Sequence, residues 1–338
     1  MPGWDLLRDV WFVLIGVLLA GYSILDGFDL GVGALLPFLA KSEDEKRTLI
    51  GAIGPFWDGN EVWLLAGGGA LFAAFPMAYA TVFSGFYLAL MLVLFALILR
   101  AVSLEFRAHD PARKRLWEAA FVGGSALPAL LFGVALGNVV VGVPLDARTE
   151  FSGTFLTLLR PLPVVFGLLG LSAFLLHGAV FAALKSEGDL RERARRTALA
   201  AAVMFAAAFV LSLVMVRLYL PAALAKIPAW VFAAVTVLSL VLAAVALKKG
   251  RDGRAFFFSS AAFLGLWGIV GTIQYPVLVR ATDPGLSLTI RNSSSSALTL
   301  QVMLIIALLG MPLVIGYTIF AFRVFKGKVR PGGAETGY

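Results

Sequence analysis

The chain has 338 residues, of which 60% are hydrophobic and 14% are charged. Soluble domains average about 25% charged residues, so the composition excludes a soluble multidomain protein and indicates a polytopic membrane protein. The lack of cysteine excludes disulfides, iron–sulfur clusters, thiolate haem ligation and thiol catalysis. The net charge of +8 does not require a nucleic acid partner, because membrane proteins concentrate Lys and Arg in cytoplasmic loops.

Apolar segments follow one another along the whole chain, and each is long enough to cross about 30 Å of hydrocarbon. The first carries Asp26 and Asp29 and is too long for a signal peptide, so we expect a retained span. The predicted spans are roughly 9–39, 49–75, 77–104, 118–142, 155–184, 196–220, 228–248, 255–279 and 299–325. No linker is long enough to form a domain, so we predict one integral membrane domain over 1–338, an all-α protein with about nine transmembrane helices.

The linkers alternate in basic charge. Of the 28 Lys and Arg residues, 21 fall in one alternate set, which ends with Arg323, Lys326, Lys328 and Arg330. The other set holds Arg8, Arg148, Arg160, Arg217, Lys226, Arg280 and Arg291. The positive-inside rule therefore predicts an N-terminus outside the cell and a C-terminus in the cytoplasm.

The two histidines do not indicate a metal site. His109 lies in a basic segment, where a solvated loop residue is the favoured interpretation. His177, near the end of the fifth span, could ligate haem or a metal, but a hydrogen bond in helix packing is favoured. No His/Glu pair has the spacing of a helical metal site, and no nucleophile motif or phosphate loop is present. The sequence thus contains no complete catalytic site.

Acidic residues inside the spans are the unusual feature. Asp26 and Asp29 share one helix face, and Asp58 and Glu61 are also three residues apart. Asp29 is about ten residues, roughly 15 Å, from the cytoplasmic end of its span, and Asp58 lies at roughly 14 Å. Two antiparallel spans would bring these acids to one depth. Glycines at 27, 31 and 33 in the first span and at 51, 54 and 59 in the second would allow the two helices to approach closely.

Two interpretations of these acids stay open. Buried acid carries a cost of about 2.5–3.5 kcal/mol on insertion scales, so it needs a function or a partner. The acids could form a proton-uptake path, or they could pair with a cation such as Arg100 or with a partner subunit. Trp57 and Trp63 flank the second pair and are interpreted as packing or interface anchors.

Several motifs together carry a family resemblance. They are LDGFDLGVG at 25–33, WDGNEVWL at 57–64, GGGALFAAFP at 67–76, FSGFY at 83–87, GVALGNVVVGVP at 133–144, and the run Ser293–Ser296 followed by Leu298-Thr299-Leu300. Combined, these closely resemble subunit II of the cytochrome bd-type quinol oxidases. The chain departs from some relatives at Arg291-Asn292, where a tryptophan–aspartate can occur. A polar connector is the simpler interpretation of the serines.

The resemblance implies two four-helix bundles plus one peripheral helix. It implies a heterodimer with subunit I, which holds two haems b and haem d, and it allows a small third subunit. The complex oxidises quinol, reduces O₂ to water and takes protons from the cytoplasm, in a bacterial or archaeal plasma membrane. This chain would bind no haem, although the family allows a structural quinone in this subunit.

The resemblance also implies residue roles. Asp58 lies on a proton route towards the haems in the family, and Trp63 lies near a lateral oxygen path. We expect Asp58 to be the main proton carrier, with Glu61, Asp29 and Asp26 linking it to the cytoplasm and Asn60 orienting it. Two alternatives are a secondary transporter that couples ions through the buried acids, and a scaffold without a proton role.

Overall fold

The computed structural model describes residues 2–329, so Arg330 of the basic C-terminal segment lies outside the described residues. The described chain folds into eleven α-helices and a two-stranded antiparallel sheet. The helices are α1 (Pro2–Leu39), α2 (Glu43–Ile53), α3 (Trp57–Ala74), α4 (Pro76–Gly85), α5 (Tyr87–His109), α6 (Lys114–Val141), α7 (Pro161–Lys185), α8 (Gly188–Tyr219), α9 (Ile227–Lys248), α10 (Asp252–Gln274) and α11 (Ala297–Val324). Strand β1 (Val277–Val279) pairs with β2 (Leu288–Thr289).

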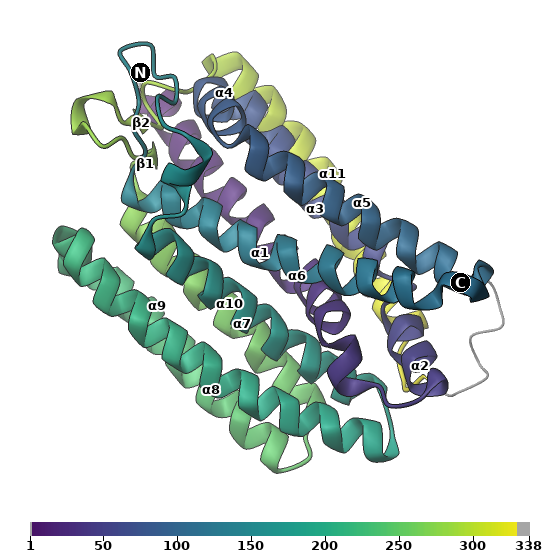
Figure 1. Ribbon diagram of the computed structural model, residues 1–338. Helices are drawn as coiled ribbons and strands as arrows, with labels where there is room; N and C mark the ends of the chain where they lie inside the picture. The colour runs from purple at the N-terminus through teal and green to yellow at the C-terminus, as the bar shows by residue number, and fades with distance from the viewer. Residues whose placement is uncertain (1, 330–338) are drawn as a thin grey trace.

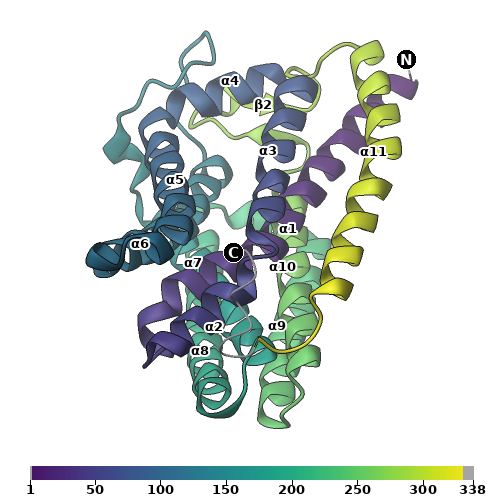
Figure 2. The same ribbon diagram turned by 90° about the vertical axis from the view of Figure 1, so that its right-hand side faces the viewer.

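The long helices form two bundles (Figure 1). In the first, α1 packs on α3 and α6, and α6 packs on α5. In the second, α7, α8, α9 and α10 pack on one another, and α7 also contacts α1 and α6. Helix α11 lies at the side of the first bundle against α1 and α3 (Figure 2). The expected architecture of two four-helix bundles plus one peripheral helix is thereby confirmed.

Eight helices between residues 2 and 329 are long and apolar enough to cross a membrane. Helix α3 is not among them, because Asp58, Asn60 and Glu61 occupy its first two turns. It nevertheless packs along α1 within the first bundle. Counting α3 with the eight gives nine, the number that the linker charges predict.

Two segments that we expected to be continuous helices are interrupted. The segment 49–75 breaks between Ile53 and Trp57, where Pro55 lacks the N–H that a helix interior requires. The segment 77–104 breaks at Phe86 (φ −100°, ψ 17°), which separates α4 from α5. Figure 2 shows α4 lying across the end of the bundle, between α3 and α5. Helix α3 therefore starts at Trp57, and of its polar first turns Asn60 is buried in the interior whereas Asp58 is exposed.

Gly27, Gly31 and Gly33 of α1 do not face the second span, so that expectation was wrong. A Cβ on Gly31 would lie 2.0 Å from the carbonyl oxygen of Phe174, and one on Gly33 would lie 2.1 Å from Ser125 Oγ. Gly27 packs against the Phe174 ring, whereas Gly59 of α3 faces open space. These three glycines thus permit close contact with α6 and α7 rather than with α3.

The serine run is a structured connector between α3, α1 and α11. Ser295 donates from its N–H to Ala74 O (2.9 Å) and from its hydroxyl to Ala73 O (2.6 Å). Ser294 Oγ accepts a hydrogen bond from Arg8 Nε at 2.8 Å. Ser296 caps α11 by accepting from Thr299 N. Before the run, Asn292 Oδ1 accepts from Thr289 N at 2.7 Å, which closes the turn after β2.

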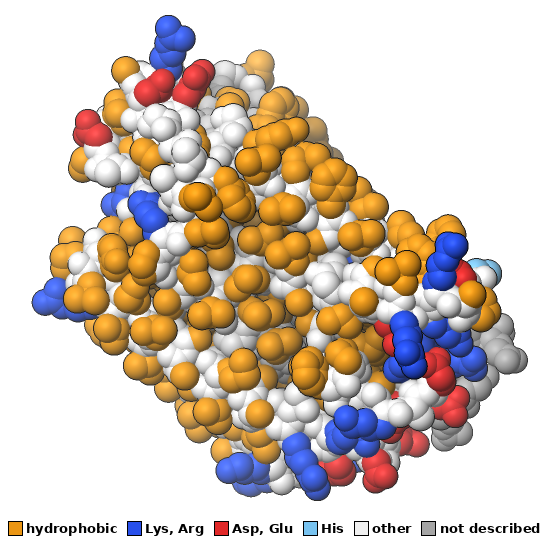
Figure 3. Space-filling model, in the orientation of Figure 1, with side chains coloured by type: hydrophobic (Ala, Val, Ile, Leu, Met, Phe, Trp, Pro, Cys, Tyr) orange, Lys and Arg blue, Asp and Glu red, His pale blue; other side chains and the backbone are white. Residues whose placement is uncertain are grey.

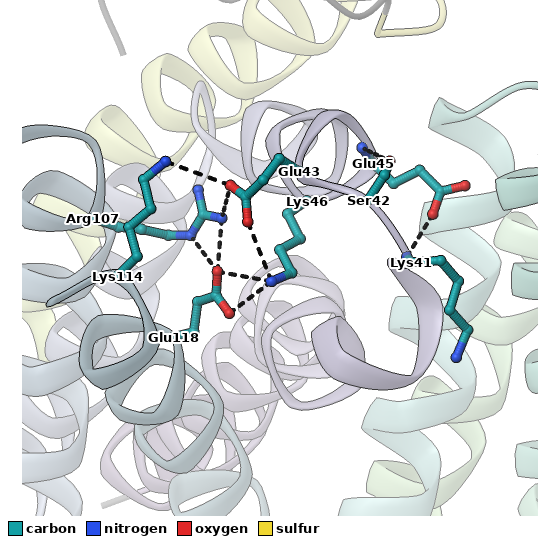
Figure 4. A network of polar contacts seen from close by, with 8 residues as sticks. All are labelled: Lys41, Ser42, Glu43, Glu45, Lys46, Arg107, Lys114 and Glu118. Carbon is teal, nitrogen blue, oxygen red and sulfur yellow. Dashed lines mark hydrogen bonds and ion pairs between the residues drawn. The ribbon is translucent and has the colours of Figure 1, made fainter. Parts of the chain in front are cut away.

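Charged side chains gather at the two ends of the molecule and leave an apolar belt between them (Figure 3). At the end opposite the N-terminus, a network joins α2, α5 and α6 (Figure 4). Glu118 accepts from Lys46 Nζ and Arg107 Nη2, both at 2.8 Å, and Arg107 also pairs with Glu43 at 2.9 Å. The network holds the short helix α2 against the bundle.

Candidate functional site

A buried polar cluster joins α1, α3 and α5. Its members are Asp26 and Asp29 on α1, Asn60 and Glu61 on α3, and Arg100 on α5. Both aspartates are fully buried. The sequence predicted that the acids of the first two spans lie at one depth, and these contacts bring Asp26, Asp29 and Glu61 together.

Arg100 is the centre of the cluster and has no solvent exposure. Its Nη2 donates to Asp26 Oδ1 at 2.8 Å and its Nη1 to Asp26 Oδ2 at 3.1 Å, which makes a bidentate pair. Nη1 also donates to Glu61 Oε1 at 3.0 Å. The pairing with Arg100, one of the two interpretations left open, is therefore present for Asp26 and Glu61.

Asp29 has no cationic partner among the described residues. Its Oδ2 accepts a hydrogen bond from Asn60 Nδ2 at 2.7 Å, and Oδ1 is buried without a hydrogen-bond partner between residues 2 and 329. Asn60 also donates to Leu25 O at 3.0 Å. Asn60 therefore orients Asp29, rather than Asp58 as we expected.

Asp58 lies outside this cluster. It is exposed, and its Oδ1 accepts from the N–H of Gly59 at 2.6 Å in the first turn of α3, where the helix dipole favours an anion. The side chain lines a groove of about 350 Å³ between the start of α3 and the second half of α11, which contributes Leu313, Tyr317 and Thr318. Glu61, one turn further on, reaches Arg100 in the cluster and has a quarter of its side chain exposed.

Trp63 packs on α1. A Cβ on Gly21 would lie 2.4 Å from Trp63 Cε3, so the ring lies directly on that glycine. The packing role expected for Trp63 is therefore observed. Trp57, two turns earlier, is half-buried.

His177 is satisfied within the protein. Nδ1 is 2.7 Å from Ser259 Oγ and Nε2 is 2.9 Å from Ile24 O, so both ring nitrogens are engaged in helix packing. His109 is exposed at the last position of α5, not in a loop. Across residues 2–329, no group of three or more His, Asp or Glu residues could hold a metal ion.

A large apolar cavity lies between the two bundles. Its volume is about 310 Å³, and most of its walls come from α1, α6, α7, α8, α9 and α10, with smaller contributions from α3, α4 and α5. Its polar-tipped side chains include Tyr22, Ser23 and Trp267. Trp267 Nε1 donates to Ser23 Oγ at 2.9 Å, whereas the Tyr22 hydroxyl is buried without a partner in the described chain. Sequence reasoning missed this cavity, because helices distant in the sequence line it and no local motif marks it.

Known proteins resemble this chain over nearly its whole length. The family described as "Cytochrome bd terminal oxidase subunit II" matches residues 7–325. The chain belongs to this family.

Individual relatives agree with that assignment. The "Probable cytochrome oxidase subunit 2" of Haemophilus influenzae is 37% identical, and the "Cytochrome bd-I ubiquinol oxidase subunit 2" of Escherichia coli K12 is 33% identical, each covering 97% of both chains. The "Cytochrome bd ubiquinol oxidase subunit 2" of Bacillus subtilis is 37% identical over 96% of this chain and 97% of its own.

The fold has a counterpart in the bd oxidase of Geobacillus thermodenitrificans, with a TM-score of 0.81 and 18% identity over 95% of this chain and 98% of that one. The chain is thus a multi-pass membrane subunit of a cytochrome bd terminal oxidase, an oxidoreductase complex, and its partner is subunit I.

Proposed function

We propose that this chain is the haem-free subunit of a quinol:O₂ oxidoreductase, that it supports subunit I, and that it carries part of the path for cytoplasmic protons to O₂ reduction. The observation that supports this proposal is the cluster at Arg100. Two carboxyl groups, those of Asp26 and Glu61, pair with one guanidinium group there, and the buried carboxyl of Asp29 lies nearby, bonded to Asn60. If all three carboxyls were ionised, two negative charges would be in excess of the single cation and that of Asp29 would be fully buried, which is unfavourable in a protein interior.

The path that we propose starts in the groove beside α11. Asp58 is the exposed acid at its entrance, and Glu61 is the half-buried acid one turn deeper. Asp29 is the buried acid that holds the proton, because Asn60 orients it and its Oδ1 is available to a water or a further acceptor. Asp26 and Arg100 form the fixed pair that sets the field around them. Asp58 is thus an entrance in this proposal, not the main carrier that the sequence led us to expect.

The redox chemistry belongs to the partner subunit in this proposal. A haem needs an axial ligand, and His177 fits that role poorly because both of its ring nitrogens are hydrogen-bonded to the protein. We therefore assign two haems b, haem d, and the oxidation of quinol and reduction of O₂ to subunit I. A structural quinone in this chain and a small third subunit stay predictions, as do the place of Trp63 beside an oxygen path and the electrogenic, non-pumping character of turnover.

Orientation follows from the positive-inside rule. The network of Lys46, Arg107 and Lys114 lies at the end opposite the N-terminus. We propose that this end faces the cytoplasm of a bacterial or archaeal cell and the N-terminus faces outside. The acid cluster is then reached from the cytoplasmic side.

The proposal is tested with Asp58→Asn and Glu61→Gln in the assembled complex. We expect quinol-dependent O₂ consumption and proton uptake to fall roughly 10-fold or more for each variant, because proton delivery steps typically contribute factors of this size or larger. The matched control is Asp189→Asn, an exposed acid at the start of α8. The haem absorption spectrum is measured on every variant.

Two results would contradict the proposal. Turnover near that of the wild type with intact haems would exclude the proton role of the substituted acid. A loss of haem absorption would instead show that the acid serves docking to subunit I, which is the scaffold alternative.

A further inference from the structure

Three basic side chains converge at the N-terminal end of the molecule, where α6 and α10 finish. Arg160 Nη2 donates to Asn138 Oδ1 at 3.0 Å, and Arg280 Nε donates to Val140 O at 3.0 Å, both in the last turn of α6. Lys226 Nζ donates to the carbonyl oxygens of Thr272, Ile273 and Tyr275 at the end of α10. Lys226 and Arg280 share the Ile273 carbonyl oxygen. Arg160 and Arg280 both reach Gly142, because Arg160 Nη2 donates to Gly142 O and a Cβ on Gly142 would lie 3.4 Å from Arg280 Cγ, so the three side chains form one group.

This group carries more positive charge than its surroundings neutralise. Each helix C-terminus is equivalent to about −0.5 charge, so two helix ends offset roughly one of the three positive charges. None of the three forms an ion pair with any residue between 2 and 329, and Arg160 Nε is buried without a partner there. Burial lowers the pKa of Lys226, and the positive charge of Arg280 lowers it further. The group is therefore suited to an anion.

The cationic group stands at the rim of the large apolar cavity. Val140 and Ile273, whose carbonyl oxygens hold Arg280 and Lys226, line that cavity with their side chains. Trp230, which also lines it, donates from Nε1 to Leu224 O at 2.8 Å at the same end. Tryptophan at such a level is typical of the membrane–water interface.

We propose that this site binds a phospholipid with a net negative headgroup, whose phosphate pairs with Arg160, Arg280 and Lys226 and whose acyl chain enters the apolar cavity. A free phosphate would use the charges but leave the cavity empty, and a zwitterionic lipid would bring a second positive charge to a group that already has an excess. The site is distinct from the acid cluster, and its occupancy does not depend on the proton path.

The test uses the purified, delipidated complex in detergent, reloaded with dioleoyl phosphatidylglycerol or dioleoyl phosphatidylcholine. Bound lipid is counted by native mass spectrometry, and Tm is measured on the same samples. We expect phosphatidylglycerol to bind the wild type and to raise its Tm more than phosphatidylcholine or inorganic phosphate does. In the double variant Arg160→Gln/Arg280→Gln, the affinity for phosphatidylglycerol should fall roughly 30-fold, from the contribution of two basic residues.

Three further variants separate the site from general stability. Arg148→Gln, an exposed arginine at the same end, should bind phosphatidylglycerol like the wild type. Arg160→Lys/Arg280→Lys keeps the charge and should retain the preference for the anionic lipid. Val270→Trp places bulk inside the cavity and should lose the lipid with all three cations intact. If the glutamine variant does not assemble, the lysine double variant and Val270→Trp still test whether the anionic lipid binds at this site.

The proposal is overturned if phosphatidylglycerol and phosphatidylcholine bind equally, or if inorganic phosphate protects as well as the anionic lipid. It is also overturned if the glutamine variant binds the anionic lipid unchanged. The cavity would instead be assigned to a quinone if the wild-type complex yields one quinone per complex on extraction, the Val270→Trp variant yields none, and phosphatidylglycerol does not bind.

Discussion

Arg100 decides how three acids can coexist inside the first bundle. It is fully buried and engages both oxygens of Asp26 as well as Glu61. A buried pair is weak support for stability in itself, but removing one partner leaves an uncompensated charge. The sequence indicated Arg100 only as one of two possible partners, because an arginine in an apolar span does not reveal which acid it faces.

Replacing Arg100 by methionine should destabilise the assembled complex by about 3–5 kcal/mol, because Asp26 would stay buried without its cation. Thermal unfolding monitored together with haem content measures the loss. Arg115→Met, an exposed arginine at the start of α6, is the control. The double variant Asp26→Asn/Arg100→Gln should recover part of the stability, and purely additive effects would show that the two side chains do not interact.

The helix contact between α1 and α7 depends on two glycines at one crossing. A Cβ on Gly178 would lie 2.3 Å from the backbone carbon of Gly31, and one on Gly31 would lie 2.0 Å from Phe174 O. Both contacts involve backbone atoms, which cannot move aside as a flexible side chain can. The short distance between α1 and α7 at this crossing therefore depends on the absence of side chains at Gly31 and Gly178.

Gly178→Ala should separate α1 from α7 and lower stability by about 1–3 kcal/mol, the usual cost of overpacking. Gly123→Ala on α6 is the matched control, because a Cβ there meets nothing within 4 Å, and alanine should raise helix stability slightly. Tm of the two variants, measured on the same day in the same detergent, makes the comparison. A Gly178→Ala protein as stable as Gly123→Ala would show that the crossing tolerates a methyl group.

Helix α11 is held mainly at its ends. Near its start, Trp11 Nε1 donates to Leu300 O at 2.9 Å. Beyond its end, Val329 N donates to Lys185 O at 2.9 Å, and Lys328 Nζ donates to Ser186 O at 2.8 Å. These contacts tie the peripheral helix to the α7–α8 turn, and so they place the wall of the groove at Asp58.

At the scale of the whole molecule, ion pairs connect helices at the end opposite the N-terminus. Glu43 joins α2 to α5 through Arg107, and Glu45 joins α2 to α8 through Arg193 (Figure 4 shows the first of these). Burial by itself would raise the pKa of both glutamates. For Glu43, the charge of Arg107 outweighs burial and lowers the pKa below the ordinary 4.5. For Glu45, hydrogen bonds from the Lys41 N–H and from Arg193 do the same. A lowered folded-state pKa means that this stabilisation is present above pH 4.5 and is lost as the pH falls below it.

We expect Tm to fall between pH 5 and pH 3, and the double variant Glu43→Gln/Glu45→Gln to show a smaller fall. The difference should be modest, about 0.2–1 kcal/mol per pair, because Glu43 is 47% exposed and water screens the interaction. It should shrink in 1 M salt. Glu105→Gln, an exposed acid on α5, is the control and should keep the full acid dependence. An unchanged slope in the double variant would contradict the prediction.

The sequence alone determined the class of the protein, the number of spans and the presence of acid within them, because hydropathy and charge belong to local windows of the chain. Motif density at 25–33 and 57–76 was sufficient to indicate the family, which the comparisons confirm. Only the tertiary structure decided that Asp58 faces a groove while Glu61 and Asp29 enter the cluster. It also decided that Gly27, Gly31 and Gly33 face α6 and α7, and that helices of both bundles line one cavity. These outcomes depend on how each helix is rotated about its axis and on which distant helix packs against it. A one-dimensional pattern does not contain that rotation, because several faces of an apolar helix satisfy the membrane equally well.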